Sequence, residues 1–339
     1  MSTSSVETAV PPTVARRLVG LACRAPSVHN TQPWAWRIGP DGIDLYADHS
    51  RQLTMSDPDG RNLVISCGAA LHHLQVAALA TGWRPEVTRL PDPADPDLLA
   101  HVRLTPAPSP PAALEQLKAL TRRCTDRRRF TSWPLPAERL EGLATLAAEW
   151  DVHGVALTDE SDRFQVELLV SRALQLQSRD RAVAEEQRAW VHRGSADDGV
   201  PVQGLPVEAP GRDSRRSRFG TGELDDPGRD VDGGDGLVLL SADVDQPLSW
   251  LRAGEALSAL WLYAVHEGLS VVPLSQVVEV PESRAALQYG VLGGLAAPLL
   301  LVRVGWQAIS RSQLEPTPRR PLEDVLLPRR TRDQRPTHP

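Results

Sequence analysis

The sequence predicts an α+β fold in which one arrangement of helices and strands is used twice. Two helical segments, one beginning at Gly68 and one at Gly254, share the pattern G-x-A-L-x-x-L-x-x-x-A-x-x-x-G at identical spacing. Apolar residues at this spacing form a single buried stripe, and the last glycine favours a helix end. Around both segments, helices and strands alternate without the strict rhythm of a parallel βαβ sheet, which favours α+β over α/β.

The elements expected in the first half follow from periodicity and from turn residues. Apolar spacing predicts the first helix, and the two prolines of the run APSVHNTQPW prevent that helix from continuing. A Pro40-Asp41-Gly42 turn then joins two strands. The expected elements are a helix over about 12–24, strands at Trp34–Ile38 and Ile43–Ala47, the Gly68 helix, and a strand at His101–Leu104.

The second half repeats this layout with longer helices. Its expected elements are a helix at Ala137–Trp150, a strand at Val152–Leu157, a helix over about 162–192, a strand at Leu237–Ser241, the Gly254 helix, and a strand at Pro298–Val304. We therefore expect one half at 12–110 and the other at 111–328. The proline-rich stretch Pro91–Pro111 is expected to be an irregular link, 193–236 a long lid or disordered loop, and 1–11 and 329–339 flexible tails.

The composition is that of an ordinary folded protein. The chain has 339 residues, is 41% hydrophobic and 24% charged, and carries a formal net charge of −6, which argues against a nucleic-acid partner. No apolar run approaches the ~18 residues of a membrane-spanning helix, and the N-terminus lacks the pattern of a signal peptide. The three cysteines are far apart and not in metal-ligand spacing, so we expect reduced thiols in the cytoplasm and no metal site.

The ten residues APSVHNTQPW, at positions 25–34, are the most informative stretch of the chain. Between its two prolines stand four hydrogen-bonding side chains, Ser27, His29, Asn30 and Gln32. Such a cluster is suited to the polar edge of a planar heterocycle. The alternative is a loop shaped by its own Asx- and Ser-turn hydrogen bonds.

Arginines gather in two places. Five of them fall within the eight residues 122–129, and the pair Arg319-Arg320 precedes the segment PLEDVL. Guanidinium groups bind phosphate through paired hydrogen bonds, so each cluster is a candidate site for a phosphate dianion. Because Lys118 is the only lysine, nearly every cation in this chain is an arginine. A solvated basic loop, a nucleic-acid contact or a charged tail therefore remains the alternative.

These blocks resemble the FMN-dependent nitroreductase family, and in particular its Acg-like branch of actinobacterial NAD(P)H nitroreductases. The shared blocks are APSxHNTQPW, DPxGR…SCGAAL, RxTDRRxF and an RRPLEDVL-like end, and the resemblance covers roughly residues 12–328. It implies FMN as the cofactor. Two-chain members of the family hold FMN at their subunit interface, so the resemblance implies a chain whose diverged halves mimic that homodimer, as a monomer or a weak homodimer.

The resemblance also implies which residues form the cofactor site. The flavin-facing candidates are Ser27, Asn30, Gln32, Pro273, Leu274 and Ser275, and the phosphate-binding candidates are Arg123, Thr125, Arg127, Arg128, Arg319 and Arg320. For Arg319 the implied place is behind Arg320. For the segment 273–275 a simple helix-to-strand connection is the alternative.

The implied activity is that of an oxidoreductase that passes hydride from NAD(P)H to FMN and then to a nitroaromatic or quinone-type acceptor. The flavin carries this chemistry, so no catalytic side chain is expected, and no G-x-S-x-G elbow or strand–GxGxxG–helix unit occurs. The alternative is a protein that stores FMN with little or no turnover, its flavin covered by the loop 193–236.

Overall fold

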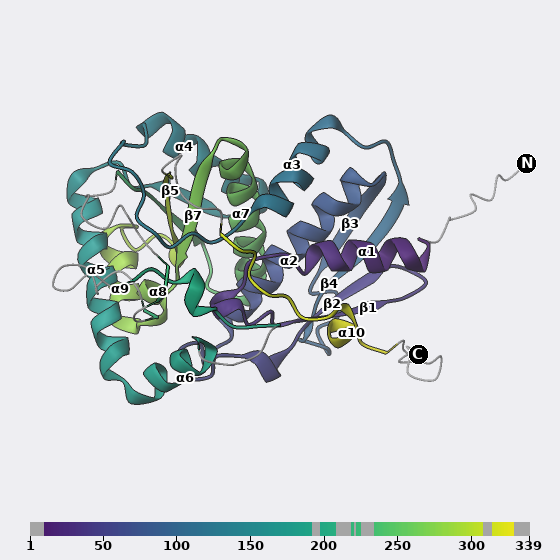
Figure 1. Ribbon diagram of the computed structural model, residues 1–339, viewed down its shortest axis with the longest axis horizontal. Helices are drawn as coiled ribbons and strands as arrows, with labels where there is room; N and C mark the ends of the chain where they lie inside the picture. Colours follow the sequence, from purple (N-terminus) through teal and green to yellow (C-terminus); the bar gives the residue numbers. More distant parts are fainter. Residues whose placement is uncertain are drawn as a thin grey trace, which may run out of the picture.

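The computed structural model describes residues 10–191, 197–207, 218–219, 222–224, 234–307 and 314–328. It contains two four-stranded antiparallel sheets in two lobes (Figure 1). The first sheet has the order β1-β2-β4-β3 and the second β5-β6-β8-β7, which is the same order with four added to each number. The α+β prediction is confirmed, and the two sheets share one topology.

The strands of the first sheet are β1 (Trp34–Ile38), β2 (Ile43–Ala47), β3 (Trp83–Arg89) and β4 (Leu98–Pro106), and those of the second are β5 (His153–Ala156), β6 (Gly236–Ala242), β7 (Leu269–Leu274) and β8 (Ala297–Trp306). The α-helices are α1 (Pro12–Ala22), α2 (Arg61–Ala80), α3 (Pro111–Arg122), α4 (Ala137–Thr145), α5 (Glu160–Arg179), α6 (Arg181–Val191), α7 (Pro247–His266), α8 (Gln276–Glu279), α9 (Pro281–Gly290) and α10 (Leu322–Val325). Single 3-10 turns lie at Val28–Asn30, His49–Arg51, Leu146–Trp150 and Val202–Gly204.

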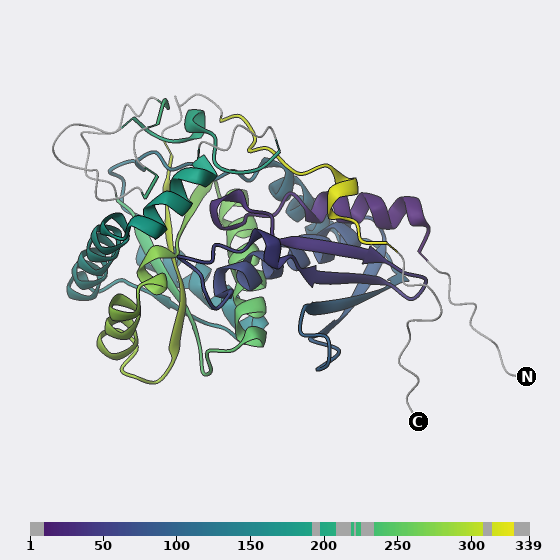
Figure 2. The same ribbon diagram turned by 90° about the horizontal axis from the view of Figure 1, so that it is seen from below.

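The two repeat helices, α2 and α7, pack against each other in the middle of the molecule, between the sheets (Figures 1 and 2). Gly68 and Gly254 stand at their crossing. A Cβ added to Gly68 would lie 2.0 Å from the carbonyl oxygen of Leu251, and one added to Gly254 would lie 2.0 Å from that of Ile65. Glycine is required here because the two backbones touch. Helix α2 is long and apolar enough to cross a membrane, but most of it is buried inside the protein, as in a core helix.

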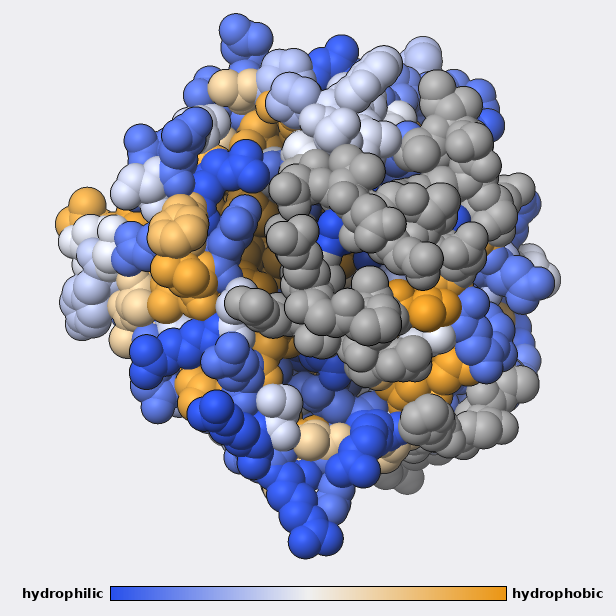
Figure 3. Space-filling view, turned by 60° about the vertical axis from the view of Figure 1, so that its left-hand side comes forward, coloured by the Kyte–Doolittle hydropathy of each residue, from blue (hydrophilic) through white to orange (hydrophobic). Residues whose placement is uncertain are grey.

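A C-terminal segment, residues 314–328, crosses from the second lobe to the first, as Figure 2 shows in yellow. We call it the strap. Its helix α10 contacts α1 and β1, Val325 is buried, and the amide of Leu327 donates to the carbonyl of Trp36 (2.7 Å). On the part of the face in Figure 3 that is not grey, hydrophilic residues and apolar patches are mixed, which is usual for folded proteins.

Several elements differ from the sequence predictions. The edge strands β3 and β7 were not expected, because each contains a proline (Pro85, Pro273), which is tolerated only at sheet edges. Strand β4 confirms the strand expected at His101–Leu104 but is longer, so the stretch expected to be an irregular link at Pro91–Pro111 is largely a strand between 98 and 106. The helix expected over 162–192 is broken at Asp180, whose carboxylate accepts from the amides of Ala182 and Val183 and so caps a new helix.

Helix α3 was not expected either; it begins with Pro111 at its first turn, a favoured position for proline. The tail expected at 329–339 lies outside the described residues, as does all of 1–11 except its last two positions. Of the loop expected at 193–236, only 197–207, 218–219, 222–224 and 234–236 are described.

One cross-strand pair gives a pH-dependent prediction. Asp44 of β2 faces His101 of β4, with Oδ1 2.7 Å from Nδ1, and this hydrogen bond raises the pKa of His101 above its usual 6.5. The added stability is therefore complete below about pH 6.5 and is lost as the pH rises through the folded-state pKa. Because the pair is partly exposed, we expect a loss of about 0.2–1 kcal/mol between pH 6 and 8.

Urea unfolding at several pH values measures this loss. Asp44→Asn is expected to remove it, whereas Asp243→Asn, which alters the exposed Asp243–His153 pair, serves as the matched control. An identical pH slope for wild type and Asp44→Asn would contradict the prediction.

Candidate functional site

A hollow lies between the two lobes, with walls from both. Its lining is mainly apolar, with a few polar groups, and no described lining residue is acidic. The first half contributes Pro26, Ser27, Val28, His29, Asn62, Ile65 and Ser66, and the rest of the chain contributes Thr125, Arg127, Arg218, Phe219, Leu257, Trp261, Val272, Pro273, Ser275 and Leu300. We call it the ring hollow. It is built at the crossing of α2 and α7, so the repeat glycines position both walls.

The backbone of APSVHNTQPW folds tightly beside this hollow. His29, Asn30 and Gln32 have φ angles of 47°, 55° and 51°, in the left-handed region that non-glycine residues seldom adopt. Two hydroxyls hold the loop, because the Ser27 Oγ accepts from the amide of Gln32 (2.9 Å) and the Ser66 Oγ from that of Val28 (3.1 Å). The result places Pro26–His29 on the wall of the hollow.

His29 is buried in this wall and uncharged. Burial, with the charges of Arg218 and Arg127, holds the pKa of His29 well below its usual value. Its Nδ1 has no hydrogen-bond partner among the described residues, and its Nε2 accepts from Arg218 (3.2 Å). A neutral imidazole here gives the wall of the hollow a hydrogen-bonding edge that carries no charge.

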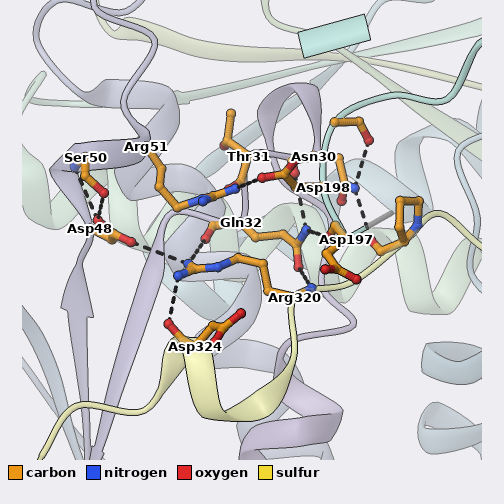
Figure 4. Close-up of polar contacts among 12 residues, drawn as sticks. Asn30, Thr31, Gln32, Asp48, Ser50, Arg51, Asp197, Asp198, Arg320 and Asp324 are labelled. Atoms are coloured by element: carbon orange, nitrogen blue, oxygen red, sulfur yellow. Dashed lines mark hydrogen bonds and ion pairs between the residues drawn. The ribbon is translucent and has the colours of Figure 1, made fainter. Parts of the chain in front are cut away.

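Asn30 and Gln32 do not line the ring hollow. Figure 4 shows their amides between the segment 197–199 and the strap. Gln32 donates to the carbonyl of Asp197 (2.9 Å) and accepts from the amide of Arg320 (2.9 Å). Asn30 donates to the carbonyls of Gly199 (2.9 Å) and Pro318 (3.1 Å). Only Ser27 of the three loop candidates reaches the hollow.

The arginine run divides between several environments. Arg127 and Thr125 line the ring hollow, where the Arg127 Cζ lies 5.0 Å from the centre of the Phe219 ring. Burial and the charge of Arg218 lower the pKa of Arg127 to about 10, so it stays a cation at neutral pH. Arg128 points elsewhere: it is 2% exposed and forms a two-pronged ion pair with Asp126 (2.7 Å).

A second hollow, of about 530 Å³, adjoins the first and is strongly basic. Its described lining includes four arginines, Arg24, Arg122, Arg123 and Arg319. We call it the arginine hollow. The acidic side chain at its rim, Glu315, is exposed, and no ion pair involving any of the four arginines occurs within the described residues.

Within this group Arg123 is buried and Arg319 is half-buried. The Nε of each has no hydrogen-bond partner among the described residues, although each donates from another nitrogen to the carbonyl of Arg24 (3.0 Å). Burial, followed by repulsion from Arg319, lowers the pKa of Arg123 to about 9, and burial with the charge of Arg24 lowers that of Arg319 to about 10. Guanidiniums with an unpartnered Nε and no ion pair among the described residues are suited to a bound anion.

A lining residue of one hollow contacts a lining residue of the other. The Arg123 Cζ lies 4.6 Å from the ring centre of Trp261, and Trp261 lines the ring hollow. The chain from Arg123 to Arg127 therefore passes from one hollow to the other, with Thr125 between. A ligand with an apolar ring at one end and a phosphate at the other could therefore contact both hollows.

The remaining sequence candidates have other environments. Pro273 and Ser275 line the ring hollow, whereas Leu274 packs on the apolar cluster around Leu301 and Val277. Arg320 donates to the carbonyl of Gln32 (3.2 Å) and pairs with Asp48 (3.4 Å), away from both hollows.

Sequence reasoning missed several residues of the site. Trp261 belongs to the repeat helix, whose stripe indicated only a buried face. Arg218 and Phe219 lie in a stretch without periodicity, and no sequence signal indicated that they reach the ring hollow.

Comparison with known proteins identifies the family. No protein-family model matches the chain. A Mycobacterium tuberculosis protein named "Putative NAD(P)H nitroreductase Rv3131" is 36% identical over 313 residues, covering 92% of this chain and 90% of that protein. The chain belongs to this nitroreductase family. A second M. tuberculosis member, "Putative NAD(P)H nitroreductase acg", is 32% identical over 332 residues, covering 94% and 97% of the two chains.

Solved structures of other nitroreductases are more distant. The FMN-dependent nitroreductase NfnB from Mycobacterium smegmatis, in complex with NADPH, gives a TM-score of 0.43 at 14% identity, covering 65% of this chain and all of NfnB. A Bacteroides fragilis nitroreductase with bound FMN gives a TM-score of 0.38 at 16% identity, covering 59% of this chain and 92% of the other. Likeness at this level does not identify equivalent residues.

Proposed function

We propose that this nitroreductase-family chain binds FMN across the two hollows and passes hydride from NAD(P)H to a nitroaromatic or quinone-type acceptor. The observation that carries the proposal is the pair of arginines Arg123 and Arg319, whose Nε donors have no partner and whose charges form no ion pair among the described residues. A phosphate dianion would take up these donors and lower the repulsion between the guanidiniums. The names of the relatives, NAD(P)H nitroreductases, supply the electron donor and the class of acceptor.

The chemistry of the lining residues suits such a ligand at both ends. Arg123 and Arg319 would hold the phosphate, with the hydroxyl of Thr125 beside them. The apolar wall of Ile65, Leu257 and Trp261 would exclude water from a planar ring. When bound, FMN supplies the two-electron chemistry. Arg127 places a positive charge in a water-poor site, which would stabilise negative charge on the reduced ring.

The two sheets of identical strand order support a further part of the proposal, namely that the chain is a fused pair of diverged subunits. Both walls of the ring hollow then come from one chain, so a monomer or a weak homodimer suffices.

The repeat pattern also predicts how many flavins bind. Since Gly254 corresponds to Gly68, Trp261 of the ring hollow corresponds to Gln75. At that place Gln75 donates to Glu255 (2.7 Å), which is fully buried and also paired with Arg89 (2.7 Å). A buried ion pair therefore fills the corresponding position in the other half. We expect one FMN per chain, not two.

A specific observation favours the second candidate function, FMN storage without turnover. Arg218 reaches into the ring hollow, pairs there with the buried Glu279 (3.0 Å) and donates to the Ser275 Oγ (3.0 Å). Phe219 packs edge-on against His29, with ring centres 5.0 Å apart. With these two residues in its lining, the ring hollow has a volume of about 90 Å³, well below the ~300 Å³ of small ligand pockets. A flavin ring would have to displace Phe219, which would then cover one of its faces.

Titration with FMN followed by anaerobic mixing with NADPH tests both functions. We expect one equivalent of FMN to bind, and a chain that binds none would contradict both. Rapid bleaching of the flavin absorbance by NADPH supports the oxidoreductase, and flavin that stays oxidised supports storage. Phe219→Ala serves as the comparison, because it opens the hollow and leaves Arg123 and Arg319 of the arginine hollow unchanged. Faster bleaching than wild type would show that Phe219 limits access of the nicotinamide.

A further inference from the structure

The two amides that do not line the ring hollow, those of Asn30 and Gln32, form a separate polar junction. Asn30 is 7% exposed and Gln32 is fully buried. Three hydrogen bonds join these side-chain amides to the strap: Asn30 Nδ2 to the Pro318 carbonyl (3.1 Å), Arg319 Nη1 to Asn30 Oδ1 (3.1 Å), and Arg320 N to Gln32 Oε1 (2.9 Å). A fourth runs from Arg320 Nη1 to the backbone carbonyl of Gln32 (3.2 Å). We call these two amides the clasp (Figure 4).

The clasp requires amides and not merely polar groups. Each side chain donates through nitrogen and accepts through oxygen: the segment 197–199 presents carbonyls, and the strap presents the donors of Arg319 and Arg320 together with the Pro318 carbonyl. An apolar side chain of the same size would lose both kinds of hydrogen bond. In Gln32→Leu the amide of Arg320 would lose its acceptor and the carbonyl of Asp197 would lose its donor from Gln32, and each lost hydrogen bond costs stability.

The clasp also sets the backbone of the loop. A left-handed conformation is rare for glutamine and costs roughly 1 kcal/mol, so it persists only where other contacts compensate. The hydrogen bonds to the strap supply that compensation at Gln32. The backbone N–H of Gln32 in turn donates to the Ser27 Oγ, in the wall of the ring hollow. At the other side of the junction, the strap carries Arg319 into the arginine hollow. One pair of side chains thus joins the two ends of the site.

We propose that Asn30 and Gln32 are positioning residues that couple attachment of the strap to anion binding in the arginine hollow. They contact neither hollow directly and act through Arg319 and through the Pro26–His29 wall. The proposal rests on the proposed function for the identity of the ligand, FMN, but not for the coupling itself. Because coupling between two equilibria is reciprocal, a bound anion must also protect the strap from release.

Hydrogen exchange of the strap amides, measured with and without FMN, tests the coupling. In wild type, FMN is expected to slow exchange at Arg320 and Leu327, whose amides donate to Gln32 and Trp36. In Gln32→Leu, which removes the acceptor of the Arg320 amide, exchange there should be faster without ligand, FMN should bind at least ~10-fold more weakly, and the protection by FMN should shrink. Asn30→Asp, which loses the donor to the Pro318 carbonyl, is the second variant, should Gln32→Leu not fold.

The matched control is Arg16→Ala, which removes the exposed ion pair between Arg16 and Glu323 of the strap but leaves the clasp intact. It should alter neither FMN affinity nor protection. Fast strap exchange in Gln32→Leu with unchanged FMN affinity would overturn the proposal, as would unchanged exchange. If wild type binds no FMN, the proposed function fails. Inorganic phosphate then replaces FMN as the probe, and failure of phosphate to protect the strap overturns the coupling.

Discussion

Gly254→Ala is expected to lower the free energy of unfolding by about 3 kcal/mol. The added Cβ would lie 2.0 Å from the carbonyl oxygen of Ile65 and 2.8 Å from the amide nitrogen of Ala69. Both are backbone atoms of α2, so no side chain can turn away and the two central helices must separate. Alanine gains about 1 kcal/mol in helix propensity over glycine, which offsets only part of this cost.

Urea unfolding checks this expectation, with Gly142→Ala as the matched control. Gly142 also lies inside a helix, α4, but a Cβ added there meets nothing within 4 Å. The same substitution should therefore stabilise at position 142, by up to about 1 kcal/mol, and destabilise at position 254. Equal effects at the two positions would mean that α2 and α7 do not touch at their glycines.

The same substitution should also weaken FMN binding, because the ring hollow is built on this crossing. Ile65 and Ser66 of α2 face Leu257 and Trp261 of α7 across it. Separating the helices would widen the hollow and remove close contact with a planar ring.

The central helices could be predicted from the sequence because their small residues and apolar stripe are local signals. The edge strands β3 and β7 could not, since their prolines are unfavourable in most strands and are tolerated here by position in the sheet. The break at Asp180 is a capping interaction that periodicity over a long helix conceals.

For the site, residue chemistry was more predictable than direction. Arginines and amides suited to binding were evident, but the left-handed backbone at Asn30 and Gln32 turns both side chains toward the strap. Arg128 has the same chemistry as Arg127, but the guanidinium of Arg128 donates to the carboxylate of Asp126 and does not reach the ring hollow. Arg218 enters the ring hollow through contacts with His29 and Glu279, which are distant in sequence, and no local pattern encodes them.

Replacing Arg123 by alanine is expected to weaken FMN binding by about 10- to 100-fold, since a hydrogen-bonded charge contributes about 1.5–3 kcal/mol. The stability of the ligand-free protein should change little. The lowered pKa of Arg123 shows that its charge is disfavoured in the folded state, so alanine relieves repulsion with Arg319 while losing the contact with Trp261. A loss of affinity without a loss of stability is the signature of a residue kept for binding.

Isothermal titration with FMN and urea unfolding of the free protein measure the two quantities. The matched control is Arg122→Ala, because Arg122 is the preceding residue, carries the same charge and is exposed at the rim of the same hollow. It should change FMN affinity by no more than a few-fold at ordinary salt, where exposed charges are screened. Arg123→Lys should fall between wild type and alanine, because an ammonium keeps the charge but not the planar pair of donors. Equal affinities of Arg123→Ala and Arg122→Ala would show that net charge alone attracts the ligand and that the phosphate lies outside the arginine hollow.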